Sequence, residues 1–231
     1  MRKMEARTDQ SVHRERLIMI LHGDYRDHLR DITQESISCV ITSPPFWDAT
    51  RTQTPEIGTE TTPDAYVETI VDLLANIRWT LSSRGHVFLV LGETKATETG
   101  PLALPWKTLL ALATAGWTIA TTTTFDDTVV AHLHLREYRG IPCLEPPYGS
   151  SATDRAYQPL SHDFIRFCIK SSTLTDDTIL DPCCGSGTVG MIAERLNRKF
   201  TGIEWDHASS QLAQARCSHS CNAQNPRKTG V

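Results

Sequence analysis

The sequence contains no apolar run long enough to cross a membrane. Its longest early apolar run, LIMIL at 17–21, is far shorter than the roughly 20 residues that a membrane-spanning helix needs. The N-terminal segment is charged, and no apolar region like that of a signal peptide follows it. We therefore expect a cytoplasmic protein without a membrane partner, in which residues 1–16 form a flexible N-terminus.

Disulfides and metal sites also lack support in the sequence. The chain has seven cysteines, an odd number, and no secretory signal, which argues against a disulfide framework. Cys217, His219 and Cys221 lie close together, but a zinc site needs about four ligands and no second pair stands out. We predict no metal and interpret residues 217–231 as a polar tail.

A basic charge balance is missing as well. The formal net charge is -4 and the sequence pI is about 6.1, so composition gives no sign of nucleic-acid binding. A local basic face would still be enough for such binding. Any nucleic-acid function must therefore be inferred from the chemistry of a site.

Strand-like and helix-like patterns alternate along most of the chain. Short apolar or β-branched runs predict strands, and apolar residues at helical spacing predict helices between them. The alternation predicts a single α/β domain over residues 17–216, with a mostly parallel, doubly wound sheet. Residues 126–157 show no clear period and hold several prolines and glycines, so we expect an irregular insertion there.

The segment ILDPCCGSGTVG (179–190) follows a predicted strand and opens a predicted helix. Gly185 and Gly187 allow a tight turn and a close approach to a ligand. Asp181 ends the strand, where ligands bind in open α/β sheets. Glu204 ends the next predicted strand, where a carboxylate can accept hydrogen bonds from two ribose hydroxyls. This order favours a nucleoside-containing cofactor over a merely structural glycine turn.

Two common nucleotide sites are disfavoured by the same segment. No Gly-Lys-Ser/Thr is present, so a phosphate-binding P-loop is unsupported, and the glycine spacing differs from that of dehydrogenases. DPCCGSGT followed by GIE instead resembles the S-adenosylmethionine motif of the DNA amino-methyltransferases. TSPPF (42–46) resembles the catalytic motif of that family, and its position before the cofactor motif resembles the permuted β group. The resemblance implies a Rossmann-like methyltransferase fold and S-adenosyl-L-methionine as cofactor.

The TSPPFW stretch suits the chemistry that this resemblance implies. An exocyclic amine is a poor nucleophile until hydrogen-bond acceptors draw its lone pair out of the ring. Ser43 can supply one acceptor and the carbonyl of Pro44 another, while Pro44 and Pro45 stiffen the backbone. Phe46 can stack a base that has left its duplex. The alternative, a Pro-Pro turn that caps a strand, loses weight beside the cofactor motif.

The resemblance also implies further cofactor contacts. Asp24 ends the first predicted strand and is expected near the adenine or ribose. Pro159 matches a stretch that lines the methionine end of the cofactor. The remaining predicted contacts belong to the two cofactor segments: Cys183, Ser186, Thr188 and Trp205.

Other interpretations stay open at this point. EPPY (145–148) also resembles the catalytic motif, but no apolar strand leads into it. Pro142-Cys143 and Pro182-Cys183 would suit a cysteine nucleophile, although no activating environment is visible. Two departures from the family are also present: Cys183 stands where a phenylalanine is usual, and FDDTV (125–129) stands where Trp-x-Lys is usual.

The sequence thus predicts a DNA methyltransferase specific for the N4 amine of cytosine, since serine before Pro-Pro resembles that branch. The alternatives are an adenine-N6 methyltransferase, an RNA methyltransferase, and a cofactor-binding nucleic-acid module with little turnover. The expected partners are double-stranded DNA with a flipped base, a second copy of the chain, and a cognate restriction endonuclease.

Overall fold

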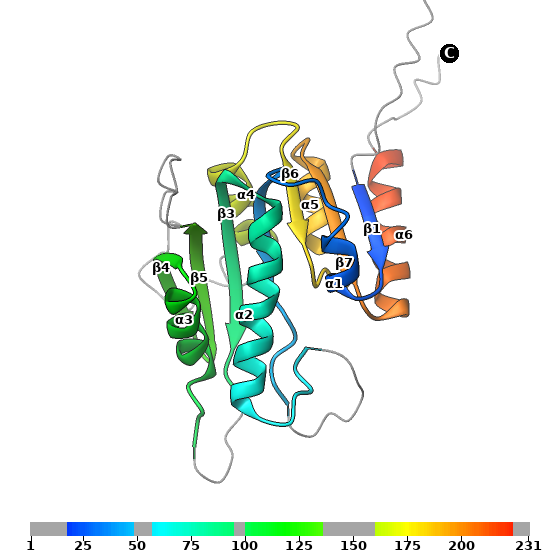
Figure 1. Cartoon of the computed structure of the whole chain (residues 1–231). Helices are drawn as coiled ribbons and strands as arrows, with labels where there is room; N and C mark the ends of the chain where they lie inside the picture. Colours follow the sequence, from blue (N-terminus) through cyan, green and yellow to red (C-terminus); the bar gives the residue numbers. More distant parts are fainter. Residues whose placement is uncertain (1–17, 49–56, 95–99, 136–159, 224–231) are drawn as a thin grey trace, which may run out of the picture.

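The structure is a computed structural model that describes residues 18–48, 57–94, 100–135 and 160–223. Its centre is a seven-stranded sheet in the order β1-β7-β6-β2-β3-β5-β4 (Figure 1). The strands are β1 (Ile18–His22), β2 (Ile37–Thr42), β3 (Leu81–Gly92), β4 (Trp117–Phe125), β5 (Thr128–Leu135), β6 (Thr178–Asp181) and β7 (Lys199–Glu204). All neighbours are parallel except the β3–β5 and β4–β5 pairs, so the predicted mostly parallel sheet is confirmed.

Helices cover both faces of this sheet (Figure 1). They are α1 (Tyr25–Leu29), α2 (Pro63–Thr80), α3 (Leu104–Thr114), α4 (His162–Ser172), α5 (Thr188–Arg195) and α6 (His207–Ala223). One buried apolar cluster joins the sheet to α1, α2 and α3, and a second joins it to α4, α5 and α6. The two clusters give the doubly wound, Rossmann-like architecture that the alternation predicts.

The longest helix begins where the sequence predicts. The Thr62 hydroxyl accepts a hydrogen bond from the Ala65 amide at 3.1 Å, and Pro63 occupies the first turn. Proline is tolerated there because its missing N–H would have no partner in the helix. Apolar residues at helical spacing, Ile70 and Leu74 among them, are fully buried against the sheet. Capping and periodicity together therefore fix α2.

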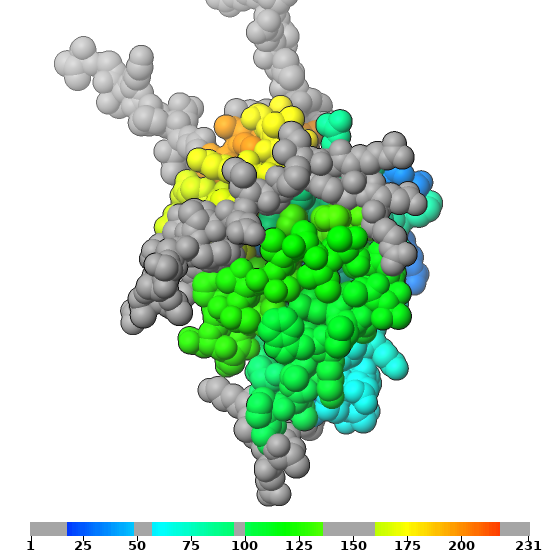
Figure 2. Space-filling model, turned by 90° about the vertical axis from the view of Figure 1, so that its left-hand side faces the viewer, coloured from blue at the N-terminus to red at the C-terminus, as the bar shows by residue number. Residues whose placement is uncertain are grey.

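The predicted irregular insertion over 126–157 is wrong in its first part, because residues 128–135 form β5. A two-residue turn, Asp126-Asp127, joins β4 to β5, and Asp126 has φ of 48°. His132 and His134 interrupt the continuous apolar run in TVVAHLHL, so the sequence pattern did not predict this buried strand. Residues 136–157 lie outside the described part of the chain. Figure 2 shows α3 and this hairpin side by side on one face of the molecule.

The predicted polar tail is also wrong at its start. Helix α6 continues past Arg216 to Ala223, and Cys217 is 3% exposed. A Cβ at Gly190 would stand 3.3 Å from the Cys217 sulfur, so the thiol packs against the backbone of α5. Within the described ranges, no group of three or more candidate ligands could hold a metal ion. The same residues include no helix of the length and apolarity needed to span a membrane.

A buried histidine pair joins β3 to β5. His86 Nδ1 lies 2.9 Å from His132 Nε2, and the His132 ring stacks on Phe88 with centroids 4.8 Å apart. Burial lowers the pKa of both imidazoles to about 4. The pair therefore stays neutral in the folded protein at pH values where the unfolded chain, with histidine pKa near 6.5, binds protons.

We expect this pair to make the fold acid-sensitive. As pH falls from about 7 to 5, both histidines bind protons in the unfolded state but stay neutral in the folded state. The free energy of unfolding therefore decreases by about 2 kcal/mol per histidine. Urea unfolding at both pH values should show a smaller acid loss in a His86→Gln/His132→Gln variant than in the wild type. Equal acid losses would contradict the prediction. Other titrating groups are retained in the variant, so the difference isolates the pair.

Candidate active site

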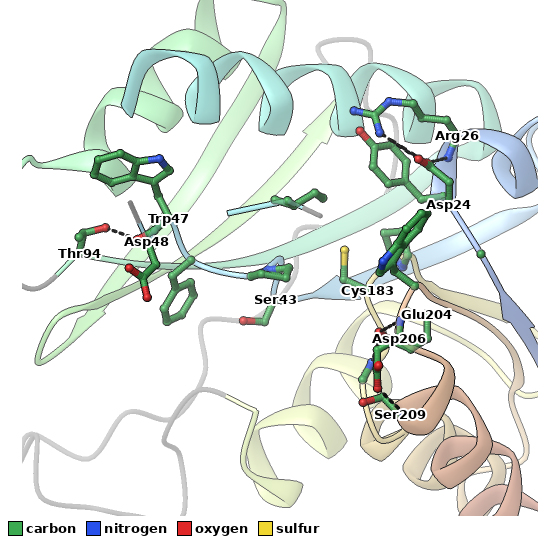
Figure 3. Close-up of a pocket in the computed structure, with 18 of the residues that line it drawn as sticks. Asp24, Arg26, Ser43, Trp47, Asp48, Thr94, Cys183, Glu204, Asp206 and Ser209 are labelled. Atoms are coloured by element: carbon green, nitrogen blue, oxygen red, sulfur yellow. Dashed lines mark hydrogen bonds and ion pairs between the residues drawn. The ribbon is translucent and has the colours of Figure 1, made fainter. Parts of the chain in front are cut away.

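The strands β1, β2, β6 and β7 end at one edge of the sheet, and a cavity of about 710 Å³ opens there (Figure 3). The loops that follow these strands supply most of its lining, and the end of β3 and the β4–β5 turn complete it. Carboxyl ends of parallel strands are where open α/β sheets bind ligands. The volume suits a ligand of nucleoside size with room for a second group.

The predicted catalytic stretch reaches this cavity directly after β2 ends at Thr42. Ser43, Pro45 and Phe46 contribute to the lining, whereas Pro44 does not. Phe46 is 38% exposed, and its ring lies against the backbone of Gly92, where any Cβ would clash with it. The sequence analysis missed this role of Gly92. Its only signal there was a glycine at the end of a buried strand.

Trp47 holds the TSPPFW segment against the core. The indole is buried, and its Nε1 donates a hydrogen bond of 2.8 Å to the carbonyl of Glu60. The Thr94 hydroxyl donates to the Trp47 carbonyl at 2.6 Å (Figure 3). The Trp47 ring is therefore buried in the cavity wall, which it also lines, while the Phe46 ring is more exposed to the cavity.

The loop between β6 and α5, residues 182–187 and here called the cofactor loop, is hydrogen-bonded to Glu204. The Gly185 amide donates to Glu204 Oε2 at 2.7 Å, and the Asp206 amide donates to Glu204 Oε1 at 2.8 Å (Figure 3). Each carboxylate oxygen keeps a lone pair for a ligand in the cavity. Gly185 has φ of +51°, and nothing stands within 4 Å of where its Cβ would be. A ligand with hydroxyl donors can therefore approach the backbone closely here.

Asp181 lies beneath the loop instead of in the cavity lining. It is 4% exposed, and its Oδ1 accepts a hydrogen bond of 3.1 Å from the Cys183 amide. Burial raises the Asp181 pKa to about 7, and the negative charge of Glu204 acts in the same direction. Asp181 thus shapes the loop and titrates near neutral pH.

Three predicted cofactor contacts face away from the cavity. Gly187 has φ of +77°, and a Cβ there would lie 2.9 Å from the Ala213 Cβ of α6. The hydroxyls of Ser186 and Thr188 accept hydrogen bonds from Arg216 Nη1, at 2.5 and 3.5 Å. These residues therefore hold the loop against α6. The sequence analysis missed Arg216, since a lone arginine on a helix carries no motif.

Other predicted residues are divided between the cavity and the undescribed part of the chain. Asp24, Cys183 and Trp205 line the cavity, and Trp205 is 41% exposed. Burial raises the Cys183 pKa well above its ordinary value, so the thiol stays protonated and is poorly suited to act as a nucleophile. Pro159 and the EPPY segment at 145–148 lie outside the described residues.

Acidic side chains that the sequence analysis did not single out surround the end of the cavity near Phe46. Asp48, Glu93 and Asp127 line it, and the Glu93 amide donates to the Asp127 carbonyl at 2.7 Å. Asp127 belongs to the FDDTV stretch, so a carboxylate stands in the region where the resemblance would have implied a lysine. Among the described lining residues the single Lys or Arg side chain is that of Arg26.

Comparisons with known proteins point to one class of enzyme. The profile of a family described as DNA methylase matches residues 147–215. Type II methyltransferase M.SmaI from Serratia marcescens is 23% identical, over 85% of this chain and 89% of its own. M.XycI from Xanthomonas campestris pv. cyanopsidis is also 23% identical, over 85% and 86%. The profile covers the cofactor loop and Glu204, which the cavity geometry singles out independently.

The family model and these relatives support an S-adenosylmethionine-dependent amino-methyltransferase of the N4/N6 class.

Solved structures agree with the fold of this class. PvuII DNA methyltransferase (cytosine-N4-specific) superposes with a TM-score of 0.66 at 17% identity, over 93% of this chain and 90% of its own. TTHA0409 of Thermus thermophilus, solved with S-adenosyl-L-methionine, gives a TM-score of 0.64 at 17% identity, over 87% and 93%. The class uses S-adenosylmethionine. The paired acceptors of Glu204 and the open backbone at Gly185 fit its ribose.

Cofactor affinity should depend on pH through Asp181. S-adenosylmethionine carries a sulfonium charge that its demethylated product lacks, and a nearby cation favours an ionised carboxylate. Because the Asp181 pKa is about 7, the affinity for S-adenosylmethionine should rise between pH 6 and 8 more than that for the product. Calorimetry at both pH values checks this, with Asp181→Asn as the control that should remove the difference. Parallel pH profiles for the two ligands would contradict it.

Proposed function

We propose that this methyltransferase transfers a methyl group to the N4 amine of cytosine in double-stranded DNA. The observation that carries the proposal is the presence of Ser43 and Phe46 in the same cavity as Gly185 and Glu204. A base stacked on Phe46 would place its amine beside Ser43, while the cofactor lies on the Glu204 side. Serine before Pro-Pro favours cytosine N4 over adenine N6, and the cytosine-N4 specificity stated for the PvuII enzyme agrees with it.

In this proposal the protein prepares the amine and leaves the chemistry to the bound cofactor. S-adenosylmethionine supplies an electrophilic methyl group: an N–CH₃ bond forms, the S–CH₃ bond breaks, and one amine proton leaves to solvent. Ser43 Oγ accepts a hydrogen bond from one amine hydrogen, which makes the nitrogen lone pair more available. Pro44, the second acceptor expected from the sequence, does not line the cavity, so the proposal rests on Ser43. Preorganised acceptors stabilise the positive charge that develops on the amine.

The described surface contributes little positive charge to DNA binding at this cavity. Asp48, Glu93 and Asp127 surround the base end, so phosphate contacts must come from other parts of the protein. A second copy of the chain would double the available surface, and a homodimer is part of the proposal. The Type II methyltransferases among the relatives suggest a restriction-modification role, with a cognate endonuclease as partner.

Nucleoside analysis tests the proposal. The chain is expressed in a host without DNA methylation, and digested DNA and RNA are analysed by mass spectrometry, with Ser43→Ala as the matched control of strongly reduced activity. N4-methylcytosine in DNA is expected. N6-methyladenine would refute the choice of base, and 5-methylcytosine would refute the acceptor mechanism. Methylated RNA alone, or no product despite cofactor binding, would favour the RNA enzyme or the binding module.

A further inference from the structure

The wall of the cavity around Asp24 is built by residues that belong to no motif of the site. Asp24 ends the loop after β1 and caps α1, so its Oδ1 accepts a hydrogen bond of 2.8 Å from the Arg26 amide. Its side chain is 22% exposed and faces the cavity (Figure 3). The Gly23 amide donates to the Glu204 carbonyl at 3.0 Å. Asp24 and Glu204 therefore stand on adjacent strand ends at one side of the cavity.

The guanidinium of Arg26 holds the second oxygen of Asp24. Its Nη1 lies 3.3 Å from Asp24 Oδ2, and its Cζ lies 4.5 Å from the centre of the Tyr25 ring. Its Nε lies 3.5 Å from Asp72 Oδ2 on α2, and the Tyr25 hydroxyl donates to the same oxygen at 3.3 Å. Tyr25 is 6% exposed. The arginine is thus fixed by an aromatic face and by a carboxylate of another helix.

This arrangement does more than a surface ion pair would. An exposed pair contributes little to stability, because two long side chains must be ordered for a screened attraction. Here the Arg26 backbone N–H donates to Asp24 Oδ1, and Arg26 Nη1 contacts both carboxylate oxygens, Oδ1 at 3.5 Å and Oδ2 at 3.3 Å, so the remaining lone pairs point in fixed directions. A preorganised acceptor binds a donor more tightly, since no side-chain entropy is lost on binding. Arg26 also offsets the repulsion among Asp24, Asp72 and Glu204.

We infer that Arg26 is a positioning residue for the cofactor: it holds the Asp24 carboxylate ready to accept a hydrogen bond from the adenosine part of S-adenosylmethionine. The inference rests on the proposed contact between Asp24 and the cofactor. The Asp72 carboxylate and the Tyr25 ring in turn hold the Arg26 guanidinium in place.

A double-mutant cycle on the full chain tests the inference, with S-adenosylmethionine affinity measured by calorimetry. Arg26→Gln should weaken binding about five- to tenfold in the wild-type background, and have no further effect in Asp24→Asn. Arg26→Lys should restore part of the affinity, because it keeps the charge but loses the planar fork. The matched control is Arg30→Gln at the end of the same helix, where Arg30 pairs with Asp27 at 3.8 Å in solvent. It should bind normally.

Kinetics separate this role from a structural one. Arg26→Gln should raise the KM for the cofactor while kcat at saturating cofactor stays within about twofold of wild type. A lower unfolding temperature with unchanged cofactor affinity would overturn the inference, as would equal losses in both backgrounds of the cycle. Unchanged affinity in Asp24→Asn would also overturn it. The proposed methylation would survive that result if N4-methylcytosine is still formed.

Discussion

Replacing Ser43 with alanine should lower the methyl-transfer rate by about 100-fold or more, the usual effect of removing one preorganised hydrogen-bonding group that acts in a transition state. The Oγ acceptor acts mainly as the amine becomes tetrahedral, so DNA affinity should change little. Phe46 and Trp47 keep their contacts in the variant, because neither depends on the Ser43 hydroxyl. Single-turnover kinetics with saturating DNA measures the rate directly.

Phe46→Ala is the matched comparison for that experiment. It removes a ring that lies over Gly92 and faces the cavity, and stacking on an aromatic side chain contributes roughly 1–3 kcal/mol per base. DNA titration should therefore show weaker binding of the flipped base, in contrast to Ser43→Ala. Neither variant should change cofactor affinity much. If Ser43→Ala transfers methyl groups at the wild-type rate, TSPPFW is only a turn that caps a strand. EPPY at 145–148 would then be the next candidate for the catalytic motif.

Glu204→Ala should weaken S-adenosylmethionine binding by about 1–3 kcal/mol, or roughly 5- to 150-fold. The variant loses the acceptors for the ribose hydroxyls and also leaves the Gly185 and Asp206 amides without their carboxylate partner. The cofactor loop should then lose its fixed position as well as a ligand contact. Calorimetry on the isolated protein measures the change without any need for DNA.

Glu204→Gln separates the two contributions. The amide keeps one acceptor oxygen for a backbone N–H but replaces the other with a donor, so its affinity should fall between those of Glu204 and the alanine variant. Thermal unfolding without cofactor serves as the control, because Glu204 is partly exposed and should contribute less to the fold than to binding. Unchanged cofactor affinity in both variants would refute the ribose contact.

The sequence predicted the mostly parallel sheet and the glycine turn between β6 and α5 because both depend on local patterns. Thr62 and Pro63 begin α2 as capping rules require, and β2, β3 and β6 each contain a short buried apolar run. Gly185 and Glu204 follow consecutive strands of a parallel sheet, so their proximity follows from chain order. The same reasoning missed β5, because His132 and His134 break its apolar period although burial and a paired imidazole accommodate them.

The tertiary structure decided which of several neighbouring residues lie in the core and which face the cavity. Within TSPPFW, the packing of Gly92 and the Glu60 carbonyl decide that Phe46 faces the cavity while Trp47 is buried. Within DPCCGSGT, Arg216 of α6 binds the hydroxyls of Ser186 and Thr188, and neither residue lines the cavity.

The contacts made by Arg26 also could not be predicted from the sequence. Its link to Asp72 joins α1 to α2, two helices that β2 and a long loop separate in the chain. Motifs record the residue types that a reaction needs, whereas side-chain direction depends on contacts between segments far apart in sequence. The sequence alone therefore indicated the residue types of the site and the alternation of strands and helices, and only the packed fold determined the order of the strands in the sheet and which side chains reach the cavity.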